Sequence, residues 1–124
     1  MKYAIIITRV LLGLMFAVFG SNAFLHFIPM PPMEGQAGAF IGALASSGYI
    51  LVIGGLQVVG GLCLLLGGRF VPLGLTLLGP VIVNIMLYHL FLDTSGLPMA
   101  CAISVLALFL LWVYRFKFPA IFQP

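Results

Sequence analysis

The sequence has very few charged residues. Only 6% of its 124 residues are charged, and they comprise five basic and two acidic side chains. A soluble domain usually has about a quarter charged residues, so this chain has too little polar surface to cover a water-exposed globule. The basic residues also form no clustered patch, which argues against a nucleic acid as a partner.

The sequence is also poor in cysteine and has no recognisable cofactor motif. Cys63 and Cys101 form no CxxC pair, and we interpret both as small packing residues rather than a redox pair. A haem motif and a nucleotide-binding loop are absent from the sequence as well. The sequence therefore predicts no self-contained catalytic centre and no evident cofactor.

Long apolar runs are abundant. Hydrophobic residues make up 64% of the chain, and the mean hydropathy is +1.31. A helix needs about 20 apolar residues to cross a bilayer, and four runs come close to this length. They are residues 3–27, 49–66, 70–92 and 97–116. The sequence therefore predicts an all-α polytopic membrane protein, in which residues 1–124 form a single four-transmembrane-helix bundle.

The connections between these runs differ in length. Gly67-Gly68 and Thr94-Ser95-Gly96 predict tight turns before the third and fourth spans. The first connection is longer, and three prolines exclude a regular helix at its start, namely Pro29, Pro31 and Pro32. Apolar residues then recur at helical spacing, at Ala37, Phe40, Ile41 and Leu44. They predict a short amphipathic helix between the first two spans, which lies on the membrane or caps the bundle.

The charged residues predict the orientation of the four spans. Four crossings place all basic residues on one side of the membrane and both acids, Glu34 and Asp93, on the other. The basic residues are Lys2, Arg9, Arg69, Arg115 and Lys117. By the positive-inside rule both termini are then cytoplasmic. An alternative, in which residues 1–23 are a cleaved signal peptide, is opposed by Arg9 within the apolar run and by the length of the segment.

Two amide side chains lie deep in the predicted spans. Asn84 is about 12 Å from the outer end of the third span, and Gln57 is at a similar depth in the second. They are predicted either to bond to each other as a structural link between helices or to contribute to a binding site. Asn84 points about 140° away from His89 around the helix, so the third span has no single polar stripe.

A second group of polar residues is predicted at the outer end of the spans. Asn22 and His26 lie there at the height of His89. Asp93 follows His89 by four residues, where it can hold the imidazole ring. With Glu34, these residues would line an outward-facing polar mouth, unless they are simply solvated at wet helix ends. No ligand spacing supports a metal site made of His26, His89 and a carboxylate.

The first span also contains a buried cation and a repeat of small residues. Arg9 is about 9 Å inside the span, where it either reaches lipid phosphate or anchors an acidic partner or ligand. Small residues repeat every four positions at Gly13, Ala17 and Ser21, and Gln57 and Gly61 have the same spacing. Such spacing indicates close helix packing within the bundle or a homodimer interface.

The order of several segments resembles that of the DoxX-like family of membrane proteins. These segments are RVLLGLMFAVFGSNAF, HFIPMPP, GLQVVGGLCLLLGG, VPLGLTLLGPVIVNIMLYHLFLD and GLPMA, and they cover nearly the whole chain. The resemblance implies a four-helix bundle in a bacterial inner membrane. It also implies a role in quinone-linked sulfur oxidation, in an oxidative-stress assembly, or as a maturation factor or receptor chaperone. Two positions depart from the family, because Ala23 replaces a frequent lysine and Gln57 replaces the usual glutamate.

These observations lead to three functional hypotheses. The first is a non-catalytic accessory or assembly subunit, whose outer mouth binds a partner membrane or periplasmic protein or an amphipathic small molecule such as a quinone. Its candidate residues are Asn22, His26, Gln57, Asn84, His89 and Asp93, with Arg9 as an anchor on the cytoplasmic side. The second is the membrane subunit of a quinone-linked oxidoreductase, in which a bound quinone or a partner supplies the redox centre. A small transporter ranks last, because the inner halves of the spans offer no continuous polar path.

Overall fold

The computed structural model describes residues 1–26 and 34–122, and α-helices dominate this part of the chain. The helices are α1 (Lys2–Leu25), α2 (Gly35–Ser47), α3 (Tyr49–Leu66), α4 (Phe70–Phe91) and α5 (Leu97–Val113), with short 3₁₀ segments η1 (Thr94–Gly96) and η2 (Arg115–Phe122). The predicted all-α fold is confirmed, and the predicted spans agree with the observed helices to within three residues at each end. The three prolines predicted to break the first connection lie outside the described residues.

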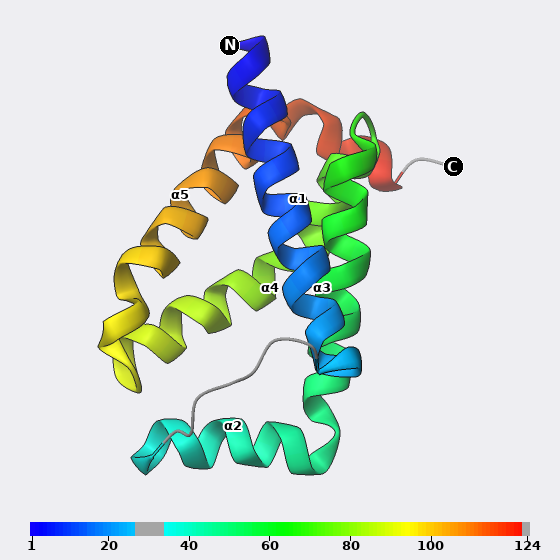
Figure 1. The fold of residues 1–124 in the computed structure, drawn as a ribbon. Helices are drawn as coiled ribbons and strands as arrows, with labels where there is room; N and C mark the ends of the chain where they lie inside the picture. Colours follow the sequence, from blue (N-terminus) through cyan, green and yellow to red (C-terminus); the bar gives the residue numbers. More distant parts are fainter. Residues whose placement is uncertain (27–33, 123–124) are drawn as a thin grey trace.

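Among the described residues, four helices are long and apolar enough to cross a membrane, namely α1, α3, α4 and α5 together with η1. α1 and α3 run side by side, while α4 passes obliquely behind them and α5 returns to α1 (Figure 1). Each of these helices packs mainly against two others, in the order α1, α3, α4, α5 and back to α1. The result is a four-helix bundle with the composition of a membrane protein.

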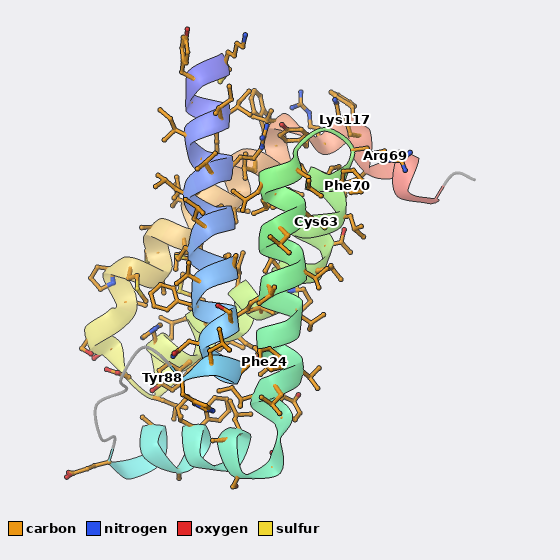
Figure 2. All side chains as sticks on the ribbon, turned by 45° about the vertical axis from the view of Figure 1, so that its right-hand side comes forward. Phe24, Cys63, Arg69, Phe70, Tyr88 and Lys117 are labelled. Carbon is orange, nitrogen blue, oxygen red and sulfur yellow. The ribbon has the colours of Figure 1, made fainter. Side chains whose placement is uncertain are left out.

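The two ends of the bundle differ in composition. The N-terminus, the turn between α3 and α4, and η2 lie at one end, and α2 lies across the other (Figure 1). Arg69 and Lys117 are both at the first end (Figure 2), which we call the basic end. There the guanidinium of Arg115 lies 4.5 Å from the ring centre of Trp112 and 4.4 Å from that of Phe116. Such aromatic and basic pairs are typical of a membrane interface. The other end is called the α2 end.

Glycines with a positive φ form the sharp corners of the chain. Gly48, with φ of 82°, ends α2 and begins α3, so that α2 turns across the end of the bundle. Gly67 and Gly68, with φ of 77° and 57°, form the predicted turn between α3 and α4. Only glycine adopts this left-handed conformation without strain from a Cβ atom.

The contact between α1 and α3 depends on small residues. A Cβ atom at Gly61 would lie 2.6 Å from the carbonyl oxygen of Gly13 and 2.8 Å from the nitrogen of Ala17. About two turns further along, a Cβ at Gly20 would lie 2.7 Å from the carbonyl oxygen of Gly54. The predicted close packing is therefore within the bundle, and Gly20 rather than Ser21 continues the contact. Backbones can approach this closely only where side chains are absent.

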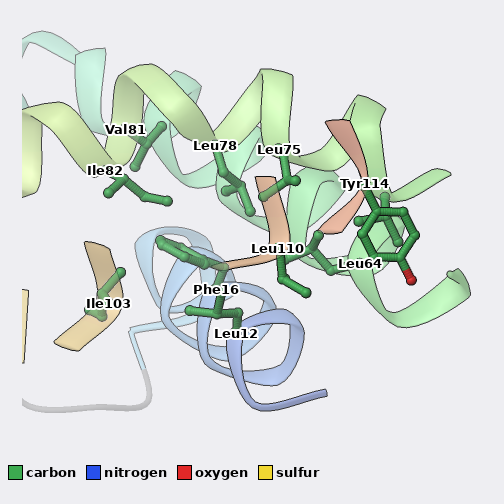
Figure 3. Packing of buried hydrophobic residues seen from close by; sticks show 11 residues of the cluster. Leu12, Phe16, Leu64, Leu75, Leu78, Val81, Ile82, Ile103, Leu110 and Tyr114 are labelled. Carbon is green, nitrogen blue, oxygen red and sulfur yellow. The ribbon is translucent and has the colours of Figure 1, made fainter. Parts of the chain in front are cut away.

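The buried apolar core lies mostly in the half of the bundle nearer the basic end. Its fully buried members come from all four spanning helices and include Leu12, Phe16, Leu64, Val71, Leu78 and Leu110 (Figure 3). α2 contains no buried residue at all. The α2 end of the bundle is therefore less tightly packed, and side chains there are more accessible.

Candidate functional site at the α2 end

His89 lies in the last turn of α4, and its ring is held in a defined orientation. Its Nδ1 atom is 2.9 Å from the backbone carbonyl oxygen of Asp93. Because a carbonyl oxygen can only accept, Nδ1 must carry the proton, and in the neutral ring Nε2 is then a hydrogen-bond acceptor. Asp93 thus holds the ring as predicted, but through its backbone and not through its carboxylate.

The carboxylate of Asp93 instead caps the short η1 turn. It accepts hydrogen bonds from the hydroxyl of Ser95 and, at 3.1 Å, from the backbone N–H of Ser95. These two bonds, with a smaller contribution from nearby His89, lower the pKa of the Asp93 carboxyl. Gly96 completes the arrangement, because a Cβ atom at this position would overlap the ring of His89. The turn is therefore shaped to receive the imidazole.

Aromatic contacts connect this site to α2. The ring of Tyr88 meets that of His89 edge-on, with centres 5.1 Å apart and an interplanar angle of 84°. The ring centre of Tyr88 also lies 5.8 Å from that of Phe40 in α2. The predicted amphipathic helix is thus present and packs on the end of the bundle through one of its apolar residues.

An apolar groove lies between α4 and α5, on the side of His89 that is nearer the middle of the bundle. Its volume is about 400 Å³, and α4 contributes Leu75, Gly79, Ile82, Val83, Met86 and Leu87 to its lining. α5 contributes Ser104, Ala107, Leu108 and Leu111. The Ser104 hydroxyl already donates to the carbonyl oxygen of Ala100 at 2.9 Å, so the lining is effectively apolar. Because Met86 precedes His89 by three residues, the groove reaches to within one helical turn of the imidazole.

The structure does not join all the residues of the predicted outer mouth. His26 is exposed at the end of α1, in the left-handed conformation with φ of 54°, and its N–H donates to the carbonyl of Asn22. Within residues 1–26 and 34–122, no hydrogen bond or ring contact joins His26 to His89. Glu34 is exposed at the start of α2. The same residues contain no cluster of three side chains that could hold a metal ion. The site consists of His89, Asp93 and their neighbours in α4 and η1.

The two deep amides face different ways. The side chain of Gln57 is half-buried and packs toward α1, where its Cβ is 2.7 Å from a Cβ built on Gly20. Asn84 is exposed, and its Nδ2 donates to the carbonyl oxygen of Pro80 in its own helix at 2.9 Å. The predicted bond between the two amides is not formed in the described structure. Neither amide is joined to His89 by a hydrogen bond there.

Arg9 has a structural role that sequence reasoning missed. Its Nε donates to the carbonyl oxygen of Leu64 at 2.9 Å, and Nη2 lies 3.4 Å from that of Leu65. These carbonyls belong to the last turn of α3, where backbone acceptors have no partner within the helix. A cation there is also favoured by the negative end of the helix dipole. The available sequence signal was depth, since Arg9 lies at the level where α3 ends.

Comparisons of the chain with protein-family models, with curated proteins and with solved structures found no match.

Proposed function

We propose that this protein is a non-catalytic accessory subunit that resides in a membrane. The protein binds an amphipathic small molecule at its α2 end. The polar head of the ligand lies at His89, and its apolar part lies in the groove between α4 and α5. The observation that supports this is the apolar groove of about 400 Å³ that leads to within one turn of an oriented histidine. Small-molecule sites usually combine an apolar cavity of this size with a few fixed polar groups.

A quinone is the ligand class that suits this arrangement best. A quinone has a ring with two oxygen atoms and an apolar isoprenoid tail, so it would place the ring near the membrane surface and the tail along the helices. With Nδ1 donating to the Asp93 carbonyl, neutral His89 offers Nε2 as an acceptor for a hydroxyl of the reduced form. In the described residues no other hydrogen bond uses this atom. The resemblance to DoxX-like proteins favours the same ligand class, and membership in that family is part of the proposal.

The proposed location is a bacterial inner membrane, with the basic end on the cytoplasmic side. This orientation is supported by the gathering of the N-terminus, the α3–α4 turn and η2 at one end of the bundle (Figure 1). In this orientation His89 and α2 face outward, near the outer leaflet.

Native mass spectrometry of the detergent-purified protein, with extraction and analysis of bound lipids, tests the proposal. We expect a co-purified quinone, and we expect His89→Ala to weaken binding of an added short-chain quinone by roughly three- to tenfold, the value of one hydrogen bond. Gly79→Leu should also reduce binding, because the new side chain would fill the groove where a Cβ meets no other atom. His26→Ala is the matched control, since this histidine at the same end is exposed and is not among the described residues that line the groove.

Two results would contradict this proposal. One is a protein that carries no quinone and shows no thermal shift when quinone is added. The other is equal weakening by His89→Ala and His26→Ala. If another polypeptide accompanies the protein in place of a small molecule, the assembly role becomes the better explanation.

A further inference from the structure

One face of α4 carries a seven-residue repeat that the bundle leaves uncovered. Its members alternate at spacings of four and three residues, and they are Leu73, Leu77, Pro80, Asn84, Leu87 and Phe91. All are exposed except Leu77, which is half-buried, and Phe91 retains 75% of its accessible surface. This spacing is typical of a helix that packs along its length against a second helix. We call this set the α4 stripe.

Asn84 is the polar member of the α4 stripe, and it lies within the membrane-spanning part of α4. It is seven residues from the end of α4, or about 10 Å of helix, with apolar stripe residues on both sides. An amide group has two N–H donors and an oxygen that accepts. One donor is used by the carbonyl of Pro80, and no other bond to this side chain is formed in the described residues. In a bilayer no water is present to satisfy the remaining donor and the oxygen.

A second copy of the same chain fits this face better than other occupants. Copies inserted with the same orientation have parallel α4 helices, so each residue of the stripe meets its equivalent at the same depth. A twofold axis along the stripe would then place Asn84 opposite Asn84, where each amide can donate to the oxygen of the other. An asparagine at one position of such a repeat is known to fix the register of paired helices. Lipid chains offer no hydrogen-bonding group to this amide.

We propose that the protein forms a parallel homodimer in the membrane through the α4 stripe, with the two Asn84 side chains hydrogen-bonded across the interface. This interface does not use the glycines at the contact between α1 and α3, because they already pack against each other within each copy. It also leaves most of the α4–α5 groove open, because Leu87 is the one residue that belongs to both the stripe and the described lining.

Single cysteines test this interface in a full-length background with Cys63→Ala and Cys101→Ala. We expect oxidation in membranes to give disulfide-linked dimers for Leu73→Cys, Leu87→Cys and Phe91→Cys. Val83→Cys is the matched control, because Val83 is next to Asn84, is 58% exposed and lies on the groove side of α4.

Energy transfer between labelled copies in lipid vesicles should also detect dimers. There, Asn84→Leu should weaken association by roughly three- to twentyfold.

Stability measurements separate association from folding. Asn84 is exposed and bonds only to its own helix in the described structure, so Asn84→Leu should leave the unfolding of the dilute monomer unchanged. The proposal is overturned if the wild type is monomeric at high protein-to-lipid ratios, if Val83→Cys crosslinks as efficiently as Leu87→Cys, or if Asn84→Leu associates as strongly as the wild type. A complex with a different membrane protein through this face would overturn it equally.

Discussion

The pair formed by α1 and α3 and the pair formed by α4 and α5 are built in opposite ways. α1 and α3 meet through glycines, and an added Cβ at several of these positions would strike backbone atoms closer than 3.0 Å. α4 and α5 are separated along part of their length by the apolar groove, where an added Cβ at Gly79 meets nothing within 4 Å. Both pairs are equally apolar, so hydrophobicity alone does not distinguish them.

The difference between the pairs has a physical cause. Apolar residues gain nothing by leaving lipid for a helix interface, so membrane helices associate where their shapes allow dense contact. Glycine allows this contact between α1 and α3, which forms the firm frame of the bundle. α5 does not come this close to α4 at Gly79, and the groove of about 400 Å³ lies between the two helices there.

Substitution of one glycine in each helix pair should give the largest difference in the free energy of unfolding. Gly61→Ala places a methyl group against the backbone of α1, and we expect it to lower the free energy of unfolding by at least about 2 kcal/mol. Gly79→Ala should be neutral or should stabilise by up to about 1 kcal/mol, because alanine favours the helix and the site has room. Unfolding of both variants in mixed micelles with sodium dodecyl sulfate measures the difference. Equal effects would mean that the two helix pairs are not packed differently.

The frame is also fastened at the basic end by Arg9, and loss of this contact should have an intermediate effect. Arg9→Met keeps the length of the side chain but removes its bonds to the carbonyls of Leu64 and Leu65. Because Arg9 is half-exposed, we expect a cost of about 1 kcal/mol, less than a fully buried bond to a charged group would give. Arg69→Met is the control, since exposed Arg69 contacts only the ring of Phe70 among the described residues. If both variants are equally stable, Arg9 does not act as a cap.

Much of the fold could be predicted from the sequence, because lipid imposes simple requirements. A chain in a bilayer must satisfy its backbone within helices of sufficient length, so the apolar runs located the four spans. The Gly67-Gly68 pair and the Thr94-Ser95-Gly96 segment located the turns, and helical spacing located α2. The contact between His89 and Asp93 was predictable for a different reason. The two residues are only four positions apart in the sequence, which brings them close together at the end of a helix.

The helix faces on which the candidate residues lie could not be predicted from the sequence. Gln57 packs toward α1, whereas Asn84 is exposed. The spanning helices are apolar on every side, so their sequences carry little information about which face meets a neighbour. The contacts of Arg9 show a second limit of prediction from sequence. Its hydrogen-bond acceptors are backbone carbonyls of α3, and because every residue has a carbonyl, the sequence does not show which ones accept. The groove depends on the shape of two packed helices and had no sequence signal.

The smallest effect is expected from the turn that supports His89, and acid should reveal it. The bonds from Ser95 lower the pKa of Asp93, so the ionised carboxylate is favoured in the folded state. The stabilisation is therefore complete above the ordinary carboxyl pKa of about 4 and is lost as the pH falls through the lower value of the folded protein. Below about pH 4, we expect the unfolding temperature in detergent to fall more for the wild type than for Asp93→Asn, which carries no charge to lose.

Glu34→Gln is the control, because the exposed Glu34 carboxylate accepts no hydrogen bond in the described structure. The acid response of Glu34→Gln should match that of the wild type. An identical acid response of Asp93→Asn and the wild type would show that the Asp93 carboxylate does not hold the turn, and the orientation of His89 would then depend on the backbone bond and on Gly96 alone.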